Sequence, residues 1–412
     1  MLPAVLTDRR RDRVYAVGRR IAAGGMGEVY AGTLRGSGRL VAIKRMLDRT
    51  GQEEDLLRLF LREVFVASTL EHPNVAEVID VGLVDQELFL VMELVEGPTL
   101  AEILETLSGR GEKLPLDVAL GIATHVARGL AYAHDRALPD GTPLGIVHRD
   151  IAPENVLVGQ DGVPKLVDFG LAKLDGQDLT QPGVIRGRPR SLAPEQARGA
   201  ETDARTDVFA LGNILCEMTA GERLYPSEAV ASLLWKVAAG DYPPVAPRLA
   251  HLDPDLVAII ERALAPAPAD RPRSARQLER ALGAFQASRE IRVSHAAIAE
   301  TVAAVWEHAR AARARVLEGS AAELEGALLT LPADELEPVA PAPAPPSSPP
   351  SAPGPKPRPP RPAGWDRVTP LPEAPARAAL GGDPVGRAWT IYGVVLLALA
   401  AGLSAWVYFV RV

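Results

Sequence analysis

The residues best suited to chemistry form two short polar blocks, His148–Asn155 and Asp168–Gly170. An aspartate such as Asp150 can accept the proton of an attacking hydroxyl group. Asn155 and Asp168 offer the amide and carboxylate oxygens that Mg²⁺ prefers as ligands. In this order the residues predict transfer of a phosphoryl group from a metal-bound nucleotide to a hydroxyl acceptor.

A glycine-rich turn and a lysine stand far upstream of these blocks. The turn Ala23–Gly27 holds three glycines, which let backbone amides approach phosphate groups closely. Lys44 ends the strand-like run Val41–Lys44, 17 positions beyond the turn, and can reach the α- and β-phosphates of a nucleotide beneath it. We expect Glu63, midway along a helical pattern, to hold this lysine by an ion pair.

Mixed α/β structure is needed to position these residues. Apolar runs bounded by turn residues predict strands at Tyr15–Ile21, Glu28–Thr33, Leu40–Arg45, Val75–Val81 and Leu88–Leu94. A helical pattern at Glu53–Leu70 interrupts the strands, and the patterns from Leu116 onward are mainly helical. A dinucleotide-binding turn is excluded because it needs a helix directly after the glycines, where this chain has a strand pattern.

The ordered set of motifs resembles the Hanks-type protein kinases, the eukaryotic-like serine/threonine kinases of bacteria, over about residues 13–285. Ala193–Glu195 closes a segment that begins at Asp168, as it does in that family. Arg271 resembles the arginine that pairs with the glutamate of that closing motif. Asp207 resembles the buried aspartate that braces the catalytic loop.

This resemblance implies an α+β, bilobal protein kinase-like fold. After a polar lead at 1–14, the kinase domain would span 15–285, with a β-rich N-lobe at about 15–95 and a helical C-lobe at about 96–285. ATP would bind between the lobes with Mg²⁺ or Mn²⁺, and Met92 resembles the gatekeeper that precedes the adenine-binding hinge. The implied ATP-binding residues are Ile21, Ala22, Ala23, Gly24, Gly25, Met26, Gly27, Val29, Ala42, Lys44, Glu93 and Val95.

Three positions depart from the family pattern. Ala22 replaces the first glycine of the loop, and Ala152 replaces a lysine that neutralises the transferring phosphoryl group. Arg188 replaces the threonine that normally bonds this lysine. We hypothesise that the Arg188 guanidinium supplies the missing charge in catalysis. The alternative is that Arg188 faces solvent, or pairs with Glu154, in a weakened enzyme.

The implied activity is that of an ATP-dependent kinase acting on serine and threonine hydroxyls of protein substrates. The alternative is a pseudokinase, a scaffold that binds ATP and transfers poorly, for which Ala152 and Arg188 are the evidence. The complete family set argues against that alternative: Lys44, Glu63, Asp150, Asn155 and Asp168. Arg149 marks family members whose activation segment is ordered by phosphorylation. We therefore expect autophosphorylation, within a homodimer, at Thr180.

Net charge and cysteine content argue against several other classes of protein. The net charge is -7, from 45 basic and 52 acidic residues, which argues against bulk nucleic-acid binding. Cys216 is the single cysteine, so the chain forms no intrachain disulfide and no cysteine-based zinc site. This composition suits a reducing cytosol.

The region after the kinase domain divides into three parts. A helical extension is expected at 286–334, because Ile298, Val302, Val305 and Trp306 recur at helical spacing after Ser294, a candidate N-cap. We expect this helix to pack on the globular unit. Residues 335–386 are predicted to be a disordered linker, since 13 of the 25 residues at 338–362 are proline.

A long apolar run ends the sequence. Trp389–Val410 has 22 residues without a charge, and a helix of roughly 33 Å crosses a hydrocarbon core of about 30 Å. Aromatic residues near both ends suit the two lipid interfaces, and the basic residues before the run favour a cytoplasmic location. We therefore expect a single-pass anchor that contacts lipid at 389–410 and holds the kinase domain at the cytoplasmic face of the inner (plasma) membrane.

Overall fold

The computed structural model describes residues 5–8, 13–24, 27–46, 68–84, 87–138, 140–168, 189–226 and 229–307. All of the described residues belong to one compact unit, which includes residues 1–326. Several predicted features lie outside the described residues: Gly25, Met26, Glu63, Thr180, Arg188, the linker at 335–386 and the apolar run at 389–410.

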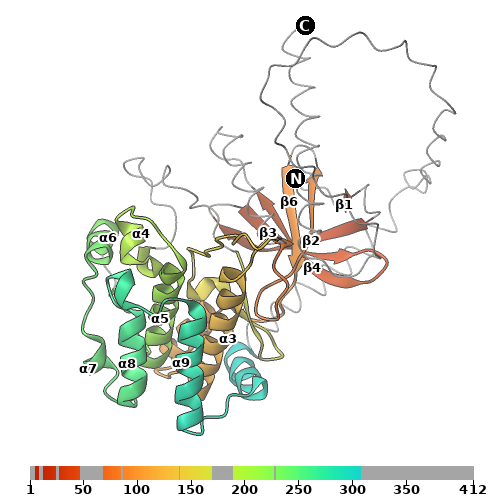
Figure 1. Cartoon of the computed structure of the whole chain (residues 1–412). Coiled ribbons are helices and arrows are strands. Elements are labelled where there is room, and N and C mark those ends of the chain that lie inside the picture. Colours follow the sequence, from red (N-terminus) through yellow and green to blue (C-terminus); the bar gives the residue numbers. More distant parts are fainter. Residues whose placement is uncertain are drawn as a thin grey trace, which may run out of the picture. The chain divides into compact units, whose positions relative to one another are not determined.

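The first part of the chain forms a six-stranded sheet (Figure 1). All neighbouring strands are antiparallel, in the order β1-β2-β3-β4-β6-β5. The strands are β1 Val5–Asp8, β2 Arg13–Gly24, β3 Gly27–Leu34, β4 Arg39–Met46, β5 Val78–Val84 and β6 Glu87–Glu93. Tyr15, Val41, Ile43, Phe89 and Val91 point to one apolar core, as strand alternation requires.

Two strands differ from the sequence prediction. β1 lies within the residues 1–14 predicted as a polar lead, and its residue Val5 pairs with Ala16 of β2. β5 begins at Val78 rather than at Val75, because Val75 forms a single parallel bridge with Leu166 instead of joining the sheet. Both differences arise from backbone pairings that the local sequence pattern does not show: Val5 with Ala16 and Val75 with Leu166.

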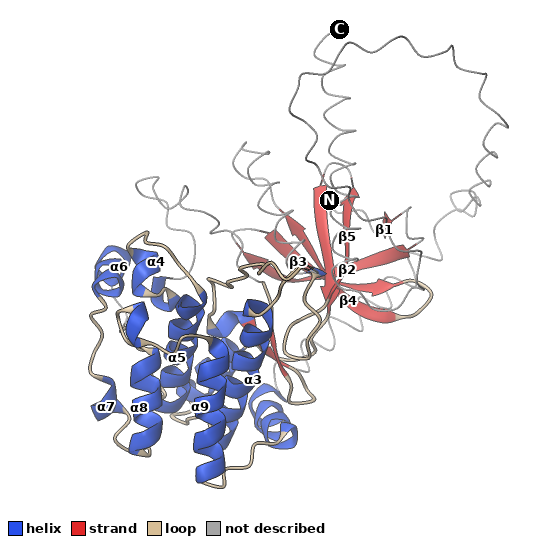
Figure 2. Ribbon diagram, viewed as in Figure 1, coloured by secondary structure: helices blue, strands red, loops and turns tan. Residues whose placement is uncertain are grey.

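The second part of the chain is helical around one large apolar core (Figure 2). Its helices are α2 Leu100–Gly109, α3 Leu116–His134, α4 Pro194–Ala197, α5 Ala204–Ala220, α6 Val230–Ala239, α7 Val245–Arg248, α8 Pro254–Ala263 and α9 Ala275–Ser288. A small hairpin pairs β7 Val156–Val158 with β8 Pro164–Leu166. α3 is apolar on nearly all sides because it packs against α5, α9 and β8.

Residues 295–307 form a further helix after α9. Ser294 caps it, since its Oγ accepts a hydrogen bond from the Ala297 amide at 3.1 Å. Its apolar side, comprising Ile298, Val302, Val305 and Trp306, is buried. It lies so close to the β7–β8 turn that a Cβ on Gly162 would be 1.9 Å from the carbonyl oxygen of His295. The helix is therefore packed directly on the rest of the unit.

A chain of hydrogen bonds connects this helix to β8. Asn74 Nδ2 donates to the Pro164 carbonyl at 2.9 Å and lies 3.2 Å from His125 Nδ1. His125 Nε2 lies 3.1 Å from His295 Nε2. His125 Nδ1 also lies 3.4 Å from the Asn74 side-chain oxygen, so this nitrogen finds a partner at Asn74 whether or not it carries a proton. Burial of the ring disfavours its charged form, and we therefore assign the neutral ring to the folded chain.

We predict that acid destabilises the fold through His125. Burial, followed by the nearby His295, Arg128 and His72, lowers the pKa of His125 from 6.5 to about 4. Between these pH values the unfolded chain binds a proton that the folded chain does not, so stability falls as the pH falls. In urea unfolding across this range, His125→Gln should show a shallower loss of stability than the unmodified chain.

His251→Gln is the matched control, because His251 is exposed and this substitution also removes one imidazole. It should leave the pH slope unchanged. Equal slopes for the unmodified chain and His125→Gln would contradict the assignment.

Candidate functional site

The site is built around Asp207, which lies in the first turns of α5. Asp203 caps this helix by accepting from the Arg205 amide at 2.8 Å. The Asp207 side chain is fully buried, and its two oxygens accept from the backbone amides of His148 at 2.7 Å and Arg149 at 2.8 Å. One carboxylate from α5 thereby fixes the loop that carries Asp150.

Asp207 is held in its charged form. Burial would raise the pKa of its carboxyl, but the hydrogen bond and charge of His134 and the contacts with His148 outweigh it, so the pKa lies below its usual value. His134 Nε2 lies 2.8 Å from Asp207 Oδ2, whereas His134 Nδ1 is buried without a hydrogen-bond partner among the described residues. Nε2 is therefore the atom through which His134 supports Asp207.

The loop itself has an unusual backbone at Arg149. Its φ of 64° lies in the left-handed region, which side chains other than glycine adopt at a cost of about 1–2 kcal/mol. The bond from the Arg149 amide to Asp207 opposes relaxation on one side, and Gln196 Nε2 donates to the Arg149 carbonyl at 2.8 Å on the other. The strained residue is therefore held from both α5 and α4.

His148 joins this loop to the strand-like segment before Asp168. The ring is completely buried, and burial lowers its pKa. Its Nε2 lies 3.2 Å from the Val167 carbonyl, and its Nδ1 accepts from the Asp150 amide at 3.4 Å. A neutral ring that donates at Nε2 and accepts at Nδ1 satisfies both contacts.

Asp150 and Asn155 are brought into direct contact. Asn155 lies in the short 3-10 turn Pro153–Asn155, and its Nδ2 donates to the Asp150 carbonyl at 2.7 Å and to Asp150 Oδ2 at 2.9 Å. The Asn155 carbonyl also accepts from the Val167 amide at 3.0 Å. Since both contacts with Asp150 use the amide nitrogen, the Asn155 side-chain oxygen is the atom suited to bind a cation.

Lys44 and Asp168 meet from opposite ends of the site. Lys44 Nζ lies 2.8 Å from Asp168 Oδ1, although 124 residues separate them in sequence. Lys44 is only 7 % exposed on β4, where it pairs with Val29 of β3 and Leu90 of β6. The structure thus places the predicted phosphate-binding cation beside the predicted metal-binding carboxylate.

The oxygen donors fit a hard divalent cation. Within the described ranges, no group of three or more His, Cys, Asp or Glu residues could hold a metal ion by itself. Mg²⁺ is typically held by one or two protein ligands and by the phosphates of its nucleotide. The Asn155 amide oxygen and the Asp168 carboxylate are therefore the ligands that this site offers to a divalent cation.

The remaining predicted nucleotide-binding residues come from adjacent strands. Ile21, Ala22, Ala23 and Gly24 lie on β2, Gly27 and Val29 on β3, and Ala42 and Lys44 on β4. Glu93 ends β6, and Val95 follows it as a buried residue. The Glu93 carboxylate binds Lys165 Nζ of β8 at 2.8 Å, so this predicted hinge is tied to the helical part of the unit.

Sequence reasoning missed His134, Gln196 and Lys165 as supports of the site. Each acts on a residue at least 47 positions away, and no local sequence pattern indicates a contact over that separation. The pairing of Arg271 with Glu195, which the resemblance implied, is present: the guanidinium donates to the two carboxylate oxygens at 2.7 and 2.8 Å.

Comparison with known proteins gives a consistent picture. A family model described as the protein kinase domain matches residues 15–281. The tyrosine-protein kinase MasK of Myxococcus xanthus is 34% identical over 275 residues, which cover 66% of this chain and 43% of that protein. The serine/threonine-protein kinase PknA of Mycobacterium tuberculosis is 33% identical over 281 residues, or 67% of this chain and 62% of that protein. The chain spans less than two thirds of the length of these curated relatives.

A solved structure has the same fold. The crystal structure of the PknI kinase domain from Mycobacterium tuberculosis superimposes with a TM-score of 0.51 and 30% sequence identity. The match covers 69% of this chain and 99% of that one. It supports a bilobal arrangement with a β-sheet N-lobe and a helical C-lobe.

We predict that Asp207→Asn destabilises the unit through the loop. Asparagine offers one acceptor oxygen, so its NH₂ group would face one of the two buried amides. The loss of an acceptor for a buried donor should lower the free energy of unfolding by about 1–3 kcal/mol, measured by urea denaturation. Hydrogen exchange at His148 and Arg149 should also become faster.

Asp203→Asn on the same helix is the control, because asparagine caps helices about as well as aspartate. A similar loss of stability in both variants would contradict the role assigned to Asp207.

Proposed function

The chain belongs to the protein kinase family, and we propose that it transfers the γ-phosphoryl group of ATP to serine and threonine hydroxyls of protein substrates. The observation that carries this proposal is the contact of Lys44 with Asp168 across 124 residues, beside the contact of Asn155 with Asp150. The Val167 amide, which precedes Asp168, joins the two pairs by donating to the Asn155 carbonyl. Serine and threonine preference is supported by the local patterns Pro153–Asn155 and Pro194–Gln196, which resemble those of serine/threonine kinases.

The proposed reaction assigns one task to each residue. Lys44 binds phosphate oxygens of ATP, and its contact with Asp168 keeps its charge beside the metal-binding carboxylate. The divalent cation, when bound, neutralises charge that develops on the transferring phosphoryl group. Asp150, oriented by the Asn155 amide, accepts the proton of the substrate hydroxyl as that oxygen attacks in line.

One family charge is missing from the described part of this site. Ala152 stands fully buried where the family pattern has a lysine, so it offers no cation to the phosphoryl group. The hypotheses that Arg188 compensates and that Thr180 is autophosphorylated concern residues outside the described ranges, and both stay proposals from the sequence.

We predict that the full-length chain, purified in mild detergent, transfers label from γ-labelled ATP to a generic protein acceptor in the presence of Mg²⁺. Asp168→Asn should reduce this transfer at least about a hundredfold, because it removes a metal-binding charge. Phosphoamino-acid analysis should find the label on serine and threonine.

The outcomes separate the proposal from its alternative. ATP binding without transfer by the unmodified chain would favour a pseudokinase scaffold. Label found mainly on tyrosine would instead reject the serine/threonine preference.

We also propose that residues 389–410 anchor the chain in the inner (plasma) membrane, with the kinase domain in the cytoplasm. The support is the uncharged run itself with its flanking basic residues. None of the helices among the described residues has the length and hydropathy needed to cross a bilayer, and residues 389–410 lie outside those ranges. In this proposal residues 335–386 act as a linker that sets the reach of the kinase domain.

Cell fractionation tests the anchor. The full chain should remain in the membrane pellet after alkaline extraction, whereas a chain ending at residue 386 should move to the supernatant. Equal distribution of the two chains between pellet and supernatant would reject the anchor.

A further inference from the structure

A cavity of about 1130 Å³ lies beside the catalytic loop. Its walls come from α2, α5 and α6, from Pro153 and Glu154, and from the turn Pro189–Ser191. Glu154 is four residues after Asp150 in the same loop. A polypeptide that presents a hydroxyl group to Asp150 therefore has neighbouring residues within reach of this cavity.

Three carboxylates from three different segments line the cavity: Glu105 of α2, Glu154 of the loop and Glu217 of α5. Burial raises the pKa of Glu217 above its usual value, while Arg223 opposes this effect and Glu154 adds to it. Glu154 and Glu217 line the same cavity, so their like charges repel one another. A cation placed among them would be stabilised.

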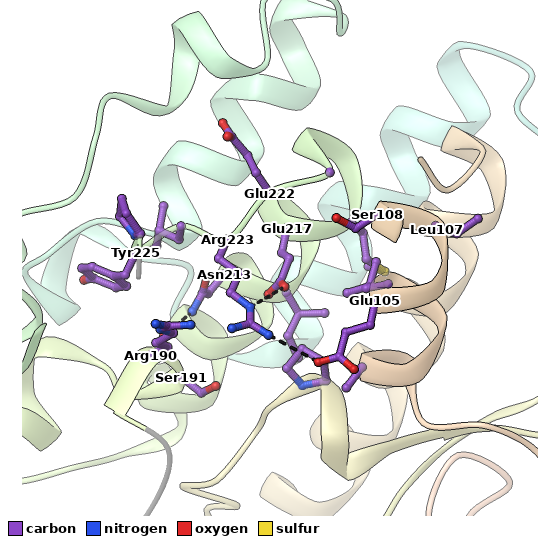
Figure 3. Close-up of a pocket in the computed structure, with 18 of the residues that line it drawn as sticks. Glu105, Leu107, Ser108, Arg190, Ser191, Asn213, Glu217, Glu222, Arg223 and Tyr225 are labelled. Atoms are coloured by element: carbon purple, nitrogen blue, oxygen red, sulfur yellow. Dashed lines mark hydrogen bonds and ion pairs between the residues drawn. The ribbon is translucent and has the colours of Figure 1, made fainter. Parts of the chain in front are cut away.

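The chain already places one of its own cations there. Arg223 Nε lies 3.6 Å from Glu217 Oε1, and Arg223 Nη2 lies 3.6 Å from Glu105 Oε1. Figure 3 shows the guanidinium between the two carboxylates, which reach it from different helices. Arg223 therefore bridges α2 and α5 across the cavity.

This bridge is weak by comparison with the buried pair in the same unit. Arg271 contacts Glu195 at 2.7 and 2.8 Å with its side chain fully buried. Arg223 makes only longer contacts, and its side chain is 49% exposed. Exposed pairs with such geometry contribute little to stability, so the fold does not depend on this bridge.

The overall charge of the cavity is sensitive to Arg223. Its lining has five carboxylates, Glu105, Glu112, Glu154, Glu217 and Glu222, and four cations, Lys113, Arg190, Arg223 and Arg248. Arg248 is committed to Glu222 at 2.7 Å. Loss of the Arg223 charge would change the balance from five against four to five against three, and would leave Glu105 and Glu217 without this guanidinium.

We propose that Arg223 is a specificity-determining residue that occupies the carboxylates which would otherwise hold a basic side chain of the substrate. The chain then favours acceptor segments with neutral rather than basic flanking residues, because an incoming arginine meets a like charge and must displace it. This inference rests on the proposed kinase activity and names the class of polypeptide that the same site takes.

The test compares acceptor peptides that differ only in the residues before the hydroxyl, either arginine or glutamine. In the full-length chain, Arg223→Gln should raise the ratio of kcat/KM for the arginine peptide to that for the glutamine peptide by about tenfold, the effect of one nearby charge close to a protein surface. Arg223→Lys keeps the charge and should leave the ratio near that of the unmodified chain.

Arg276→Gln is the matched control. Arg276 is 44% exposed and pairs with Asp135, but it does not line the cavity. Its substitution should not change the ratio. An Arg223→Gln ratio equal to that of the unmodified chain would overturn the inference.

Peptide binding, measured by fluorescence anisotropy with labelled peptides, decides the inference separately from catalysis. The arginine peptide should bind Arg223→Gln about tenfold more tightly than the unmodified chain, again from one charge interaction. Absence of transfer to every peptide would contradict the proposed kinase activity, yet this binding difference would still support the role of Arg223. Equal binding of the arginine peptide to both chains would overturn that role.

Discussion

The carboxylate of Asp207 accepts the amide hydrogens of two successive residues, His148 and Arg149, from a position without solvent exposure. The second of these amides belongs to Arg149, whose backbone is in the left-handed region. The bond to Asp207 thus holds the chain directly at this strained residue. The strain would relax if the charge were lost, so the position of Asp150 depends on a buried charge in α5.

The same constraint extends across the site through short contacts. His148 lies against the Val167 carbonyl, and the next residue, Asp168, pairs with Lys44 of β4. Asp168 also has a positive φ of 55°, so its carboxylate is presented from a second strained backbone position. The helical part of the unit is thus connected through the loop to the strand that carries the phosphate-binding lysine. Loss of the contact between His148 and Val167 would therefore alter the positions of both Asp150 and Asp168.

The sequence alone could predict the motif residues but not everything that supports them. Lys44, Asp150, Asn155 and Asp168 were identifiable because their order and spacing are distinctive. β1 was missed because a four-residue strand is too short for an alternating pattern to stand out, and its pairing with β2 is a tertiary feature. His134 acts on Asp207 from 73 positions away, a contact that no local pattern encodes.

The buried charged groups help to choose between an active kinase and a pseudokinase that only binds ATP. The Arg271–Glu195 pair and Asp207 are removed from water, and an apolar replacement of a buried pair is often neutral or stabilising. The contacts of Asp207 and the strained Arg149 hold the loop, and with it Asp150, at a fixed position, as phosphoryl transfer requires. The Arg271–Glu195 pair connects α4 to the segment before α9. The departure at Ala152 removes a charge that the family pattern offers to the phosphoryl group and leaves the described hydrogen bonds around Asp207 in place, so in the proposed reaction it would lower the rate of transfer without displacing Asp150.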